Sequence, residues 1–179
     1  NTRHSANIDV SPHDLEDTYL PAFRATVKEG KAGSVMCAYN AIDGQPACAN
    51  TYLLSDTLRK TWDFKGYVTS DCGAIADVTV GHKFAPDMAH AAAVSVKAGT
   101  DTSCGKGYAS LTEAVHEGLI SEAEIDQSVR RLFTARFELG MFDPASKVAY
   151  ARIPFSEDDS AAHRELSRVV AEKSMVLLK

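Results

Sequence analysis

Apolar side chains near the start of the chain recur at the spacing of an amphipathic helix. The helix is expected to begin at Ser11, a residue type that caps helices, with Pro12 at its first position. Its apolar stripe consists of Leu15, Tyr19, Phe23 and Val27. A short apolar run over residues 34–39 follows and predicts a buried strand, after which Asp43-Gly44 predicts a turn.

The alternation of helix and strand occurs twice more along the chain. Helical spacing covers residues 51–62 and 87–97, and a strand-like run follows each of them, at residues 66–71 and 99–104. This order predicts a parallel α/β fold. Two later helices are predicted by capping boxes, in which a glutamate follows a serine at the third position: Ser110 with Glu113 and Ser121 with Glu124.

The pattern changes beyond residue 144. Residues 145–160 lack periodicity and predict a linker, residues 163–173 predict a helix, and the apolar run 174–178 predicts a strand of a second fold. Three strands cannot close a barrel of eight, and the last apolar run stops where the sequence does. We therefore expect a partial chain that spans parts of two domains.

The overall composition excludes some classes of partner. The 179 residues include 19 Lys and Arg against 24 Asp and Glu, a formal charge of −5, so the strongly basic face that nucleic acids or anionic membranes require is not expected. Hydrophobic residues make up 45% and charged residues 24%, which predicts a folded chain. No apolar run approaches the roughly 20 residues of a membrane span.

Four cysteines leave the redox state of the chain open. Cys37, Cys48, Cys72 and Cys104 allow three pairings, and their spacing contains no CxxC motif, which disfavours a structural zinc site. Free buried thiols and disulfides are both compatible with this spacing. A secreted or periplasmic location is favoured, although four cysteines do not establish it.

The sharpest local feature is a carboxylate at the end of a predicted strand. Asp71 follows Thr69 and Ser70 and precedes a small, flexible stretch at Cys72-Gly73. A rigid but accessible carboxylate suits nucleophilic attack, since the group keeps a fixed aim and leaves room for the attacked carbon. The alternative is an aspartate that caps the following helix.

A series of segments resembles glycoside hydrolase family 3 and covers nearly the whole chain. In order they are YLPAFR (19–24), GSVMCAYN (33–40), DGQPACAN (43–50), LLSDTLR (53–59), WDFKGYVTSD (62–71), AGTD (98–101), GMFD (140–143) and VLLK (176–179). One such segment would be weak, but the ordered series is specific. The resemblance implies an α/β fold: the C-terminal half of a (β/α)8 TIM-like barrel in residues 1–144, a linker in 145–162, and the first elements of an α/β sandwich domain in 163–179.

The resemblance also implies roles for individual residues. The family retains anomeric configuration, and the Asp of its Ser-Asp motif, here Asp71, is the nucleophile. Its Met-x-x-Tyr motif maps onto Met36 and Tyr39, which would line the sugar site, with the Tyr39 hydroxyl near the nucleophile. Cys72, where many family β-glucosidases have Trp, would also contact substrate. No metal and no organic cofactor is implied.

Two groups of the family site are not present in the sequence. The Lys-His pair that grips sugar hydroxyls would lie upstream of residue 1, and the acid/base Glu would lie beyond Lys179. Several glutamates are predicted on outer helices and none is assigned as the acid: Glu113, Glu117, Glu122, Glu124 and Glu138. We therefore expect the chain to be inactive alone and to need the remainder of a parent chain, or another chain, to complete the barrel.

Cys72, with Cys37 and Cys104, resembles the β-xylosidase and α-L-arabinofuranosidase branch of the family. This implies an exo-acting enzyme that releases xylose, or arabinose, from the non-reducing ends of xylan-derived oligosaccharides. A Cys72–Cys104 bridge, with Cys37 near Cys48 for a second, is a hypothesis; four unpaired cysteines are the alternative. A family β-glucosidase and a non-catalytic carbohydrate-binding protein on the same scaffold remain as alternative functions.

Other polar residues are lesser candidates. Asp101 ends a predicted strand and is expected to be a structural hydrogen-bond partner, while Asp43 is a lesser site candidate. Arg3 and His4 precede an extended stretch, and the sequence does not decide whether they line the site. The two remaining candidates, expected to be surface or packed residues, are His82 and His90.

Overall fold

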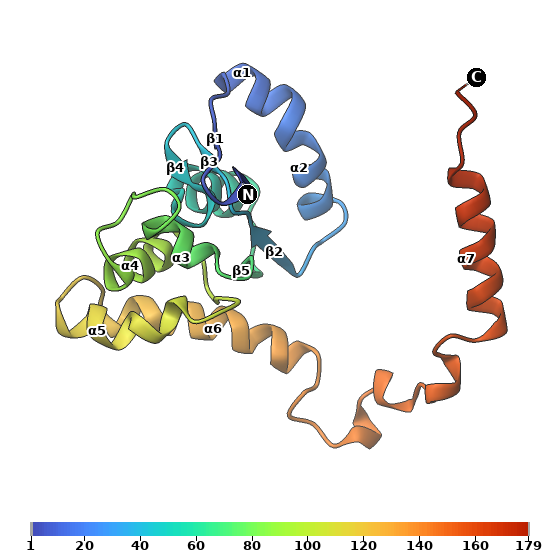
Figure 1. Cartoon of the computed structure of the whole chain (residues 1–179). Helices are drawn as coiled ribbons and strands as arrows, with labels where there is room; N and C mark the ends of the chain where they lie inside the picture. Colours follow the sequence, from blue (N-terminus) through green and yellow to red (C-terminus); the bar gives the residue numbers. More distant parts are fainter. Residues whose placement is uncertain (1, 179) are drawn as a thin grey trace. The chain divides into compact units, whose positions relative to one another are not determined.

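The computed structural model describes residues 2–178, so Asn1 and Lys179, the ends of the predicted 1–144 and 163–179 domains, lie outside the described part. The chain forms two compact units, Asn1–Arg136 and Phe137–Lys179. The first unit is a mixed α/β structure (Figure 1). Its elements, in order, are η1 (Thr2–His4), β1 (Asn7–Ile8), α1 (Pro12–Asp14), η2 (Leu15–Tyr19), α2 (Leu20–Lys28), β2 (Ser34–Cys37), β3 (Ala41–Ile42), β4 (Gln45–Pro46), η3 (Ala47–Ala49), η4 (Tyr52–Thr61), β5 (Tyr67–Ser70), α3 (Ala74–Thr79), α4 (Met88–Ala98), η5 (Gly107–Ser110), α5 (Leu111–His116) and α6 (Glu122–Glu138).

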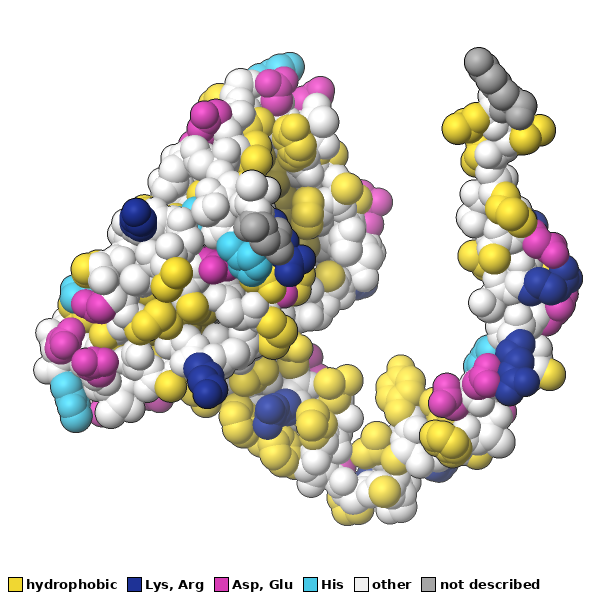
Figure 2. Space-filling model, viewed as in Figure 1, with side chains coloured by type: hydrophobic (Ala, Val, Ile, Leu, Met, Phe, Trp, Pro, Cys, Tyr) yellow, Lys and Arg dark blue, Asp and Glu magenta, His cyan; other side chains and the backbone are white. Residues whose placement is uncertain are grey.

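The first predicted helix is present as the continuous series α1, η2 and α2. Ser11 caps it as expected, because its hydroxyl accepts a hydrogen bond from the backbone N–H of Asp14 at 3.1 Å. Leu15, Leu20 and Val27 are buried, whereas the predicted stripe residues Tyr19 and Phe23 are more than half exposed. Those two side chains line an apolar pocket of about 300 Å³ formed by α2, β2 and η4, and Figure 2 shows hydrophobic side chains gathered on this face.

Parallel pairing of β2 with β5 confirms the predicted α/β order. Ser34 pairs with Tyr67, and the register continues to Cys37 opposite Ser70. The prediction that the 34–39 strand is buried is wrong, since Ser34 is exposed and Met36 is 56% exposed. The reason is that only β5 pairs with β2 among the described residues, so β2 has a free edge.

The third predicted strand is reduced to one parallel bridge between Thr69 and Thr102. A second, smaller sheet that the sequence did not predict consists of β1 parallel to β3 and β3 antiparallel to β4. The predicted turn at Asp43-Gly44 joins β3 to β4, with both residues at positive φ.

The predicted capping boxes have different outcomes. Ser121 and Glu124 form one as expected: the backbone N–H of Ser121 donates to Glu124 Oε2 at 2.9 Å. Ser110 makes no side-chain cap bond, because the 3₁₀ turn of η5 runs directly into α5 and its backbone supplies the helix start. The predicted helix at 87–97 is α4, capped by Asp87, whose carboxylate accepts from the His90 N–H at 2.9 Å.

The core of the first unit lies around β5 and α3. Val68 of β5 and Ile75 and Val78 of α3 are fully buried, and η4 covers β5 with Leu54 and Leu58. Alanines of α4 permit close packing on its neighbours: Ala89, Ala91, Ala92, Ala93 and Ala98. The end of β5 is therefore held rigidly, and the next residue, which the sequence proposes as nucleophile, has a fixed base.

The second unit has little buried surface of its own. It contains η6 (Ala145–Lys147), η7 (Tyr150–Arg152), η8 (Phe155–Glu157) and α7 (Ala161–Ser174), which confirms the helix predicted at 163–173. The strand predicted at 174–178 is wrong, since Met175–Leu178 is irregular and exposed. A strand needs a pairing partner, and the described part of this unit supplies none. The proposed boundaries at 144 and 162 stay a prediction.

Candidate active site

Asp71 lies directly after β5 and is half-buried. Its Oδ1 accepts a hydrogen bond from the backbone N–H of Cys72 at 2.6 Å, and its own N–H donates to the Cys37 carbonyl at 3.0 Å. Gly73, at φ 86°, is the N-cap of α3, so Asp71 is not the cap that the alternative interpretation requires. Within residues 2–178 no Lys, Arg or His forms an ion pair with Asp71.

Tyr39, two residues beyond β2, lies beside Asp71. Its hydroxyl donates to the Cys72 carbonyl at 2.8 Å. Loss of hydration and then a hydrogen bond and charge repulsion from Asp71 raise the pKa of Tyr39. The phenol is therefore protonated at neutral pH, with one proton and two acceptors, the Cys72 carbonyl and the Asp71 carboxylate.

Three residues from other parts of the first unit hold Tyr39 in place. The His4 ring packs on it at 4.4 Å between centroids, and the Arg3 guanidinium lies 5.1 Å from its ring centroid. His82 Nε2 lies 2.7 Å from the Tyr39 carbonyl oxygen. The sequence left Arg3 and His4 undecided, and the structure places both at the site.

Two residues of this cluster were missed by sequence reasoning. His82 was expected to be a surface or packed residue, and Asp77 was not considered, yet Asp77 Oδ2 lies 2.7 Å from His4 Nδ1. These contacts join residues 43 and 73 positions apart, so no local pattern signals them. The one local clue is that Asp77 is on α3, which begins just after Asp71.

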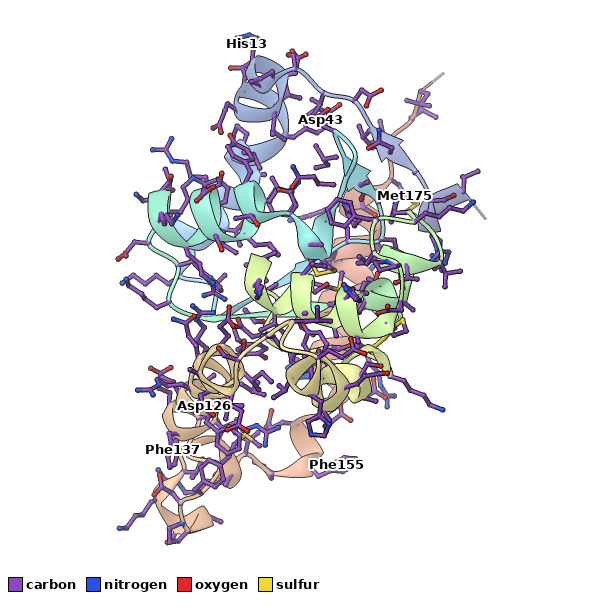
Figure 3. All side chains as sticks on the ribbon, turned by 90° about the vertical axis from the view of Figure 1, so that its left-hand side faces the viewer. His13, Asp43, Asp126, Phe137, Phe155 and Met175 are labelled. Carbon is purple, nitrogen blue, oxygen red and sulfur yellow. A yellow bond between two sulfur atoms is a disulfide. The ribbon has the colours of Figure 1, made fainter. Side chains whose placement is uncertain are left out.

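The other predicted site residues differ in their surroundings. Met36 pairs with Thr69 in the β2–β5 register, and its exposed side chain lines the apolar pocket. Cys72 is exposed and is joined to Cys104 by a disulfide, while a second disulfide joins the buried Cys37 and Cys48 (Figure 3). These are the two pairings of the hypothesis, and no cysteine is free.

Asp101 is a structural partner, as expected. Its side chain is fully buried and is bonded by Arg59 at 2.5 Å, by Arg131 at 2.8 Å and by the Val68 N–H at 2.8 Å. The cluster joins η4, β5 and α6, and its carboxylate is paired with two guanidinium groups.

Asp43 lies in a turn and His90 on a helix, and each forms a hydrogen bond that stabilises its own segment. Asp43, labelled in Figure 3, is at the β3–β4 turn and accepts from the Val10 N–H at 3.1 Å. His90 Nδ1 lies 2.9 Å from Asp87 Oδ1 at the start of α4. Among residues 2–178, neither side chain forms a hydrogen bond with Asp71 or Tyr39.

The cluster suits covalent catalysis by a carboxylate. Because the Cys72 N–H occupies Oδ1, Oδ2 of Asp71 is the oxygen left for attack on an electrophilic carbon. In the described part of the chain no group of three or more His, Cys, Asp and Glu side chains is arranged to hold a metal ion. The helices described there are also too short or too polar to cross a membrane.

Comparison with known proteins gives consistent matches. Residues 1–135 match the glycosyl hydrolase family 3 N terminal domain. The chain is 45% identical over 181 residues to a xylan 1,4-β-xylosidase of Xylanibacter ruminicola, covering 99% of this chain and 21% of that protein. It therefore spans about a fifth of the length of that relative.

Solved structures also resemble the chain. A family 3 exo-β-xylosidase in complex with a xylobiose aziridine activity-based probe superposes with a TM-score of 0.87 at 33% identity, over 95% of this chain and 22% of that one. A β-glucosidase from Listeria innocua in complex with glucose gives a TM-score of 0.85 at 33% identity, over 97% and 24%. Both kinds of enzyme thus share the fold of this chain.

Proposed function

Because the chain belongs to glycosyl hydrolase family 3, we propose that it carries the nucleophile of a retaining, exo-acting glycoside hydrolase. The substrate is a xylan-derived oligosaccharide, from whose non-reducing end the enzyme releases xylose or arabinose. The observation that carries this proposal is the half-buried Asp71 at the rigid end of β5, bonded by the Cys72 N–H and without an ion pair to any residue of 2–178.

The reaction has two balanced steps. Oδ2 of Asp71 attacks the anomeric carbon, the bond from that carbon to the leaving oxygen breaks, and a Glu carboxylic acid protonates the leaving oxygen. Water, deprotonated by the same Glu, then attacks the anomeric carbon of the ester and regenerates the Asp71 carboxylate. The Tyr39 hydroxyl, which keeps its proton throughout, donates a hydrogen bond to the Asp71 carboxylate as the negative charge returns, and in the ester it keeps its bond to the Cys72 carbonyl.

The glutamates of the described chain do not supply the acid in this proposal. Retention needs two carboxyl groups about 5–5.5 Å apart, whereas Glu124 is bonded to Ser121 in a capping box and Glu113 is on α5.

We propose that residues 1–144 are the C-terminal half of a (β/α)8 barrel, that 145–162 are a linker, and that 163–179 begin an α/β sandwich domain. The acid/base comes from another part of the longer protein.

The test uses the longest protein that contains these 179 residues, below called the enzyme. Proton NMR of an early time point of aryl β-xyloside hydrolysis is expected to show the β-anomer of xylose first. Asp71→Gly with added azide is expected to give an α-xylosyl azide, since azide replaces the missing carboxylate. An α-anomer as the first product would contradict retention.

The specificity and the class of the protein are tested separately. Rates on aryl β-xyloside, α-L-arabinofuranoside and β-glucoside rank the three sugars, and preference for the glucoside would favour the β-glucosidase alternative, supported by the Listeria innocua likeness. A non-catalytic binding protein would bind xylo-oligosaccharide equally well after Asp71→Asn and hydrolyse none. The purified 179-residue chain is expected to be inactive, and measurable xylosidase activity would contradict that expectation.

A further inference from the structure

The cluster around Tyr39 contains a carboxylate–imidazole pair that the two-step reaction does not use. Asp77 Oδ2 lies 2.7 Å from His4 Nδ1, with 15% of the Asp77 side chain and 36% of the His4 side chain exposed. On the other edge of the ring, His4 Nε2 accepts a hydrogen bond from Arg3 Nε at 3.4 Å. The ring proton is therefore on Nδ1, from which it is donated in a hydrogen bond to Asp77. The imidazole plane is thereby fixed from two sides.

The fixed imidazole rests on Tyr39. The two ring centroids are 4.4 Å apart with planes tilted by 56°, so the orientation of His4 determines where the Tyr39 ring can lie. Asp77 is on α3, the helix that begins three residues after Asp71, and Tyr39 lies two residues beyond β2. The pair thus couples the helix after the nucleophile to the tyrosine beside it.

The backbone around His4 is also fixed. A Cβ added to Gly81 would lie 2.0 Å from the His4 carbonyl oxygen, so the loop after α3 packs directly on the segment that carries His4. His82, the next residue, bonds the Tyr39 carbonyl at 2.7 Å. Tyr39 is therefore held at its backbone by His82, at its ring by His4 and at its hydroxyl by Cys72.

From these contacts we propose that Asp77 and His4 are positioning residues for Tyr39. They hold its ring so that the hydroxyl stays within reach of the Asp71 carboxylate through both steps of the reaction. Neither residue touches the reacting atoms. The inference rests on the proposed function, because it assigns the pair a task at the same nucleophile.

The first test replaces Asp77 in the enzyme. Asp77→Leu removes the acceptor for His4 and is expected to lower kcat on an aryl β-xyloside by about tenfold or more with KM changed by about twofold at most, because misplacement by a fraction of an ångström weakens reaction more than binding. Asp77→Asn keeps an acceptor oxygen at the same place and is expected to stay within about threefold of the parent.

A double-mutant cycle separates positioning from a general structural role. In a Tyr39→Phe background there is no hydroxyl to place, so Asp77→Leu is expected to change kcat by about twofold at most. Equal losses in both backgrounds would overturn the inference. His4→Phe keeps a ring against Tyr39 and is expected to retain more activity than His4→Ala.

The matched control is the other Asp–His pair of the first unit. Asp87→Leu removes a carboxylate bonded to His90 and also a cap of α4, but His90 does not contact Tyr39. It is expected to lower the melting temperature without lowering kcat. A loss of kcat as large as that of Asp77→Leu would show that any weakening of the fold has this effect.

A crystal structure of the Asp77→Leu enzyme gives a readout without turnover. The Tyr39 hydroxyl is expected to lie beyond hydrogen-bond distance of the Cys72 carbonyl, whereas an unchanged Tyr39 would overturn the inference. The two proposals fail differently. Full activity after Asp71→Asn defeats the proposed function, and loss of activity after Asp71→Asn with no effect of Asp77→Leu defeats only the positioning role.

Discussion

Asp71 and Asp101 belong to neighbouring segments, since Asp71 follows β5 and Asp101 precedes Thr102, which is bridged to β5, and the structure gives them opposite surroundings. Asp101 is buried against Arg59 and Arg131, which neutralise its charge and bond both of its oxygens. Asp71 is half-buried, has no cationic partner among residues 2–178, and accepts a hydrogen bond from the Cys72 N–H. Two aspartates of adjacent segments therefore divide into a group that holds the fold and a group that is accessible to a reaction partner.

The contrast extends to the tyrosine beside each carboxylate. Burial and then the charge of Asp101 raise the pKa of Tyr108 well above its ordinary value. Loss of hydration and then Asp71 raise the pKa of Tyr39. Tyr108 donates a hydrogen bond to the Thr100 carbonyl at 2.6 Å and packs in the core. The Tyr39 hydroxyl instead lies beside Asp71 and donates to the Cys72 carbonyl.

The largest expected effect is the loss of activity in Asp71→Asn. Removing the nucleophile is expected to lower kcat/KM on an aryl β-xyloside by about 10³-fold or more, because the covalent ester cannot form. The melting temperature is expected to change by about 2 °C at most, since Asp71 has no ion pair within residues 2–178 to lose. A stability loss with activity retained would reverse the roles of the two aspartates.

Asp101→Asn is expected to do the opposite. It leaves two partly buried guanidinium groups without a carboxylate, and breaking a buried cluster of this kind costs about 3–5 kcal/mol of unfolding free energy. Urea unfolding of the enzyme, followed by tryptophan fluorescence, measures this loss, because Trp62 is buried in the same core. A loss below about 1 kcal/mol would show that the cluster contributes little.

The Cys72–Cys104 disulfide links the two aspartate segments and gives the next largest effect. Replacing both cysteines by serine is expected to lower the unfolding free energy by about 2–4 kcal/mol. Because Cys72 and Cys104 are exposed and Cys37 and Cys48 are buried, a mild thiol reductant is expected to open the first bridge first.

Mass spectrometry after alkylation follows that order. Label is expected on Cys72 and Cys104 before Cys37 and Cys48, with activity falling as the first pair is labelled. Early labelling of the buried pair would contradict the difference in access.

The smallest expected effect is a dependence of the unfolding free energy on alkaline pH, which is set by the pKa values of Tyr39 and Tyr108. A phenol whose pKa is raised in the folded state stabilises the fold below the unfolded value near 10, and this contribution is lost as the pH rises through the raised pKa. In a titration of absorbance at 295 nm, Tyr39 is expected to ionise before Tyr108, and Tyr108 only together with unfolding. The variants Tyr39→Phe and Tyr108→Phe assign each absorbance change to its tyrosine. Ionisation of Tyr108 at the same pH as Tyr39 would contradict the burial of Tyr108.

Local signals predicted much of the fold and singled out Asp71 as a candidate nucleophile, a role that stays a prediction. Ser11, the Ser121–Glu124 box and the turn at Asp43 depend on bonds within a few residues, so their patterns survive in the structure. The capping box predicted at Ser110 is absent because the 3₁₀ turn of η5 leads directly into the helix. Strand, carboxylate and glycine adjoin each other at Asp71, which made it a candidate beside a helix-capping alternative, and the family resemblance then favoured the nucleophile.

Contacts across the chain were not predictable from such patterns. Asp101 binds Arg59 and Arg131 over 42 and 30 positions, and His4 meets Asp77 over 73. Burial of β2 and a strand at residues 174–178 both required pairing partners, which periodicity alone cannot supply. The environment that separates Asp71 from Asp101 is therefore a property of the tertiary structure.

The most direct test of Asp71 as nucleophile is covalent labelling of the enzyme by a slow, mechanism-based sugar. A 2-deoxy-2-fluoro xyloside with a good leaving group forms the glycosyl ester and hydrolyses it slowly, so peptide mass spectrometry locates the label. The expected result is one sugar on the peptide that contains Asp71, and none in Asp71→Asn. A label on any other carboxylate, Asp101 included, would contradict the assignment.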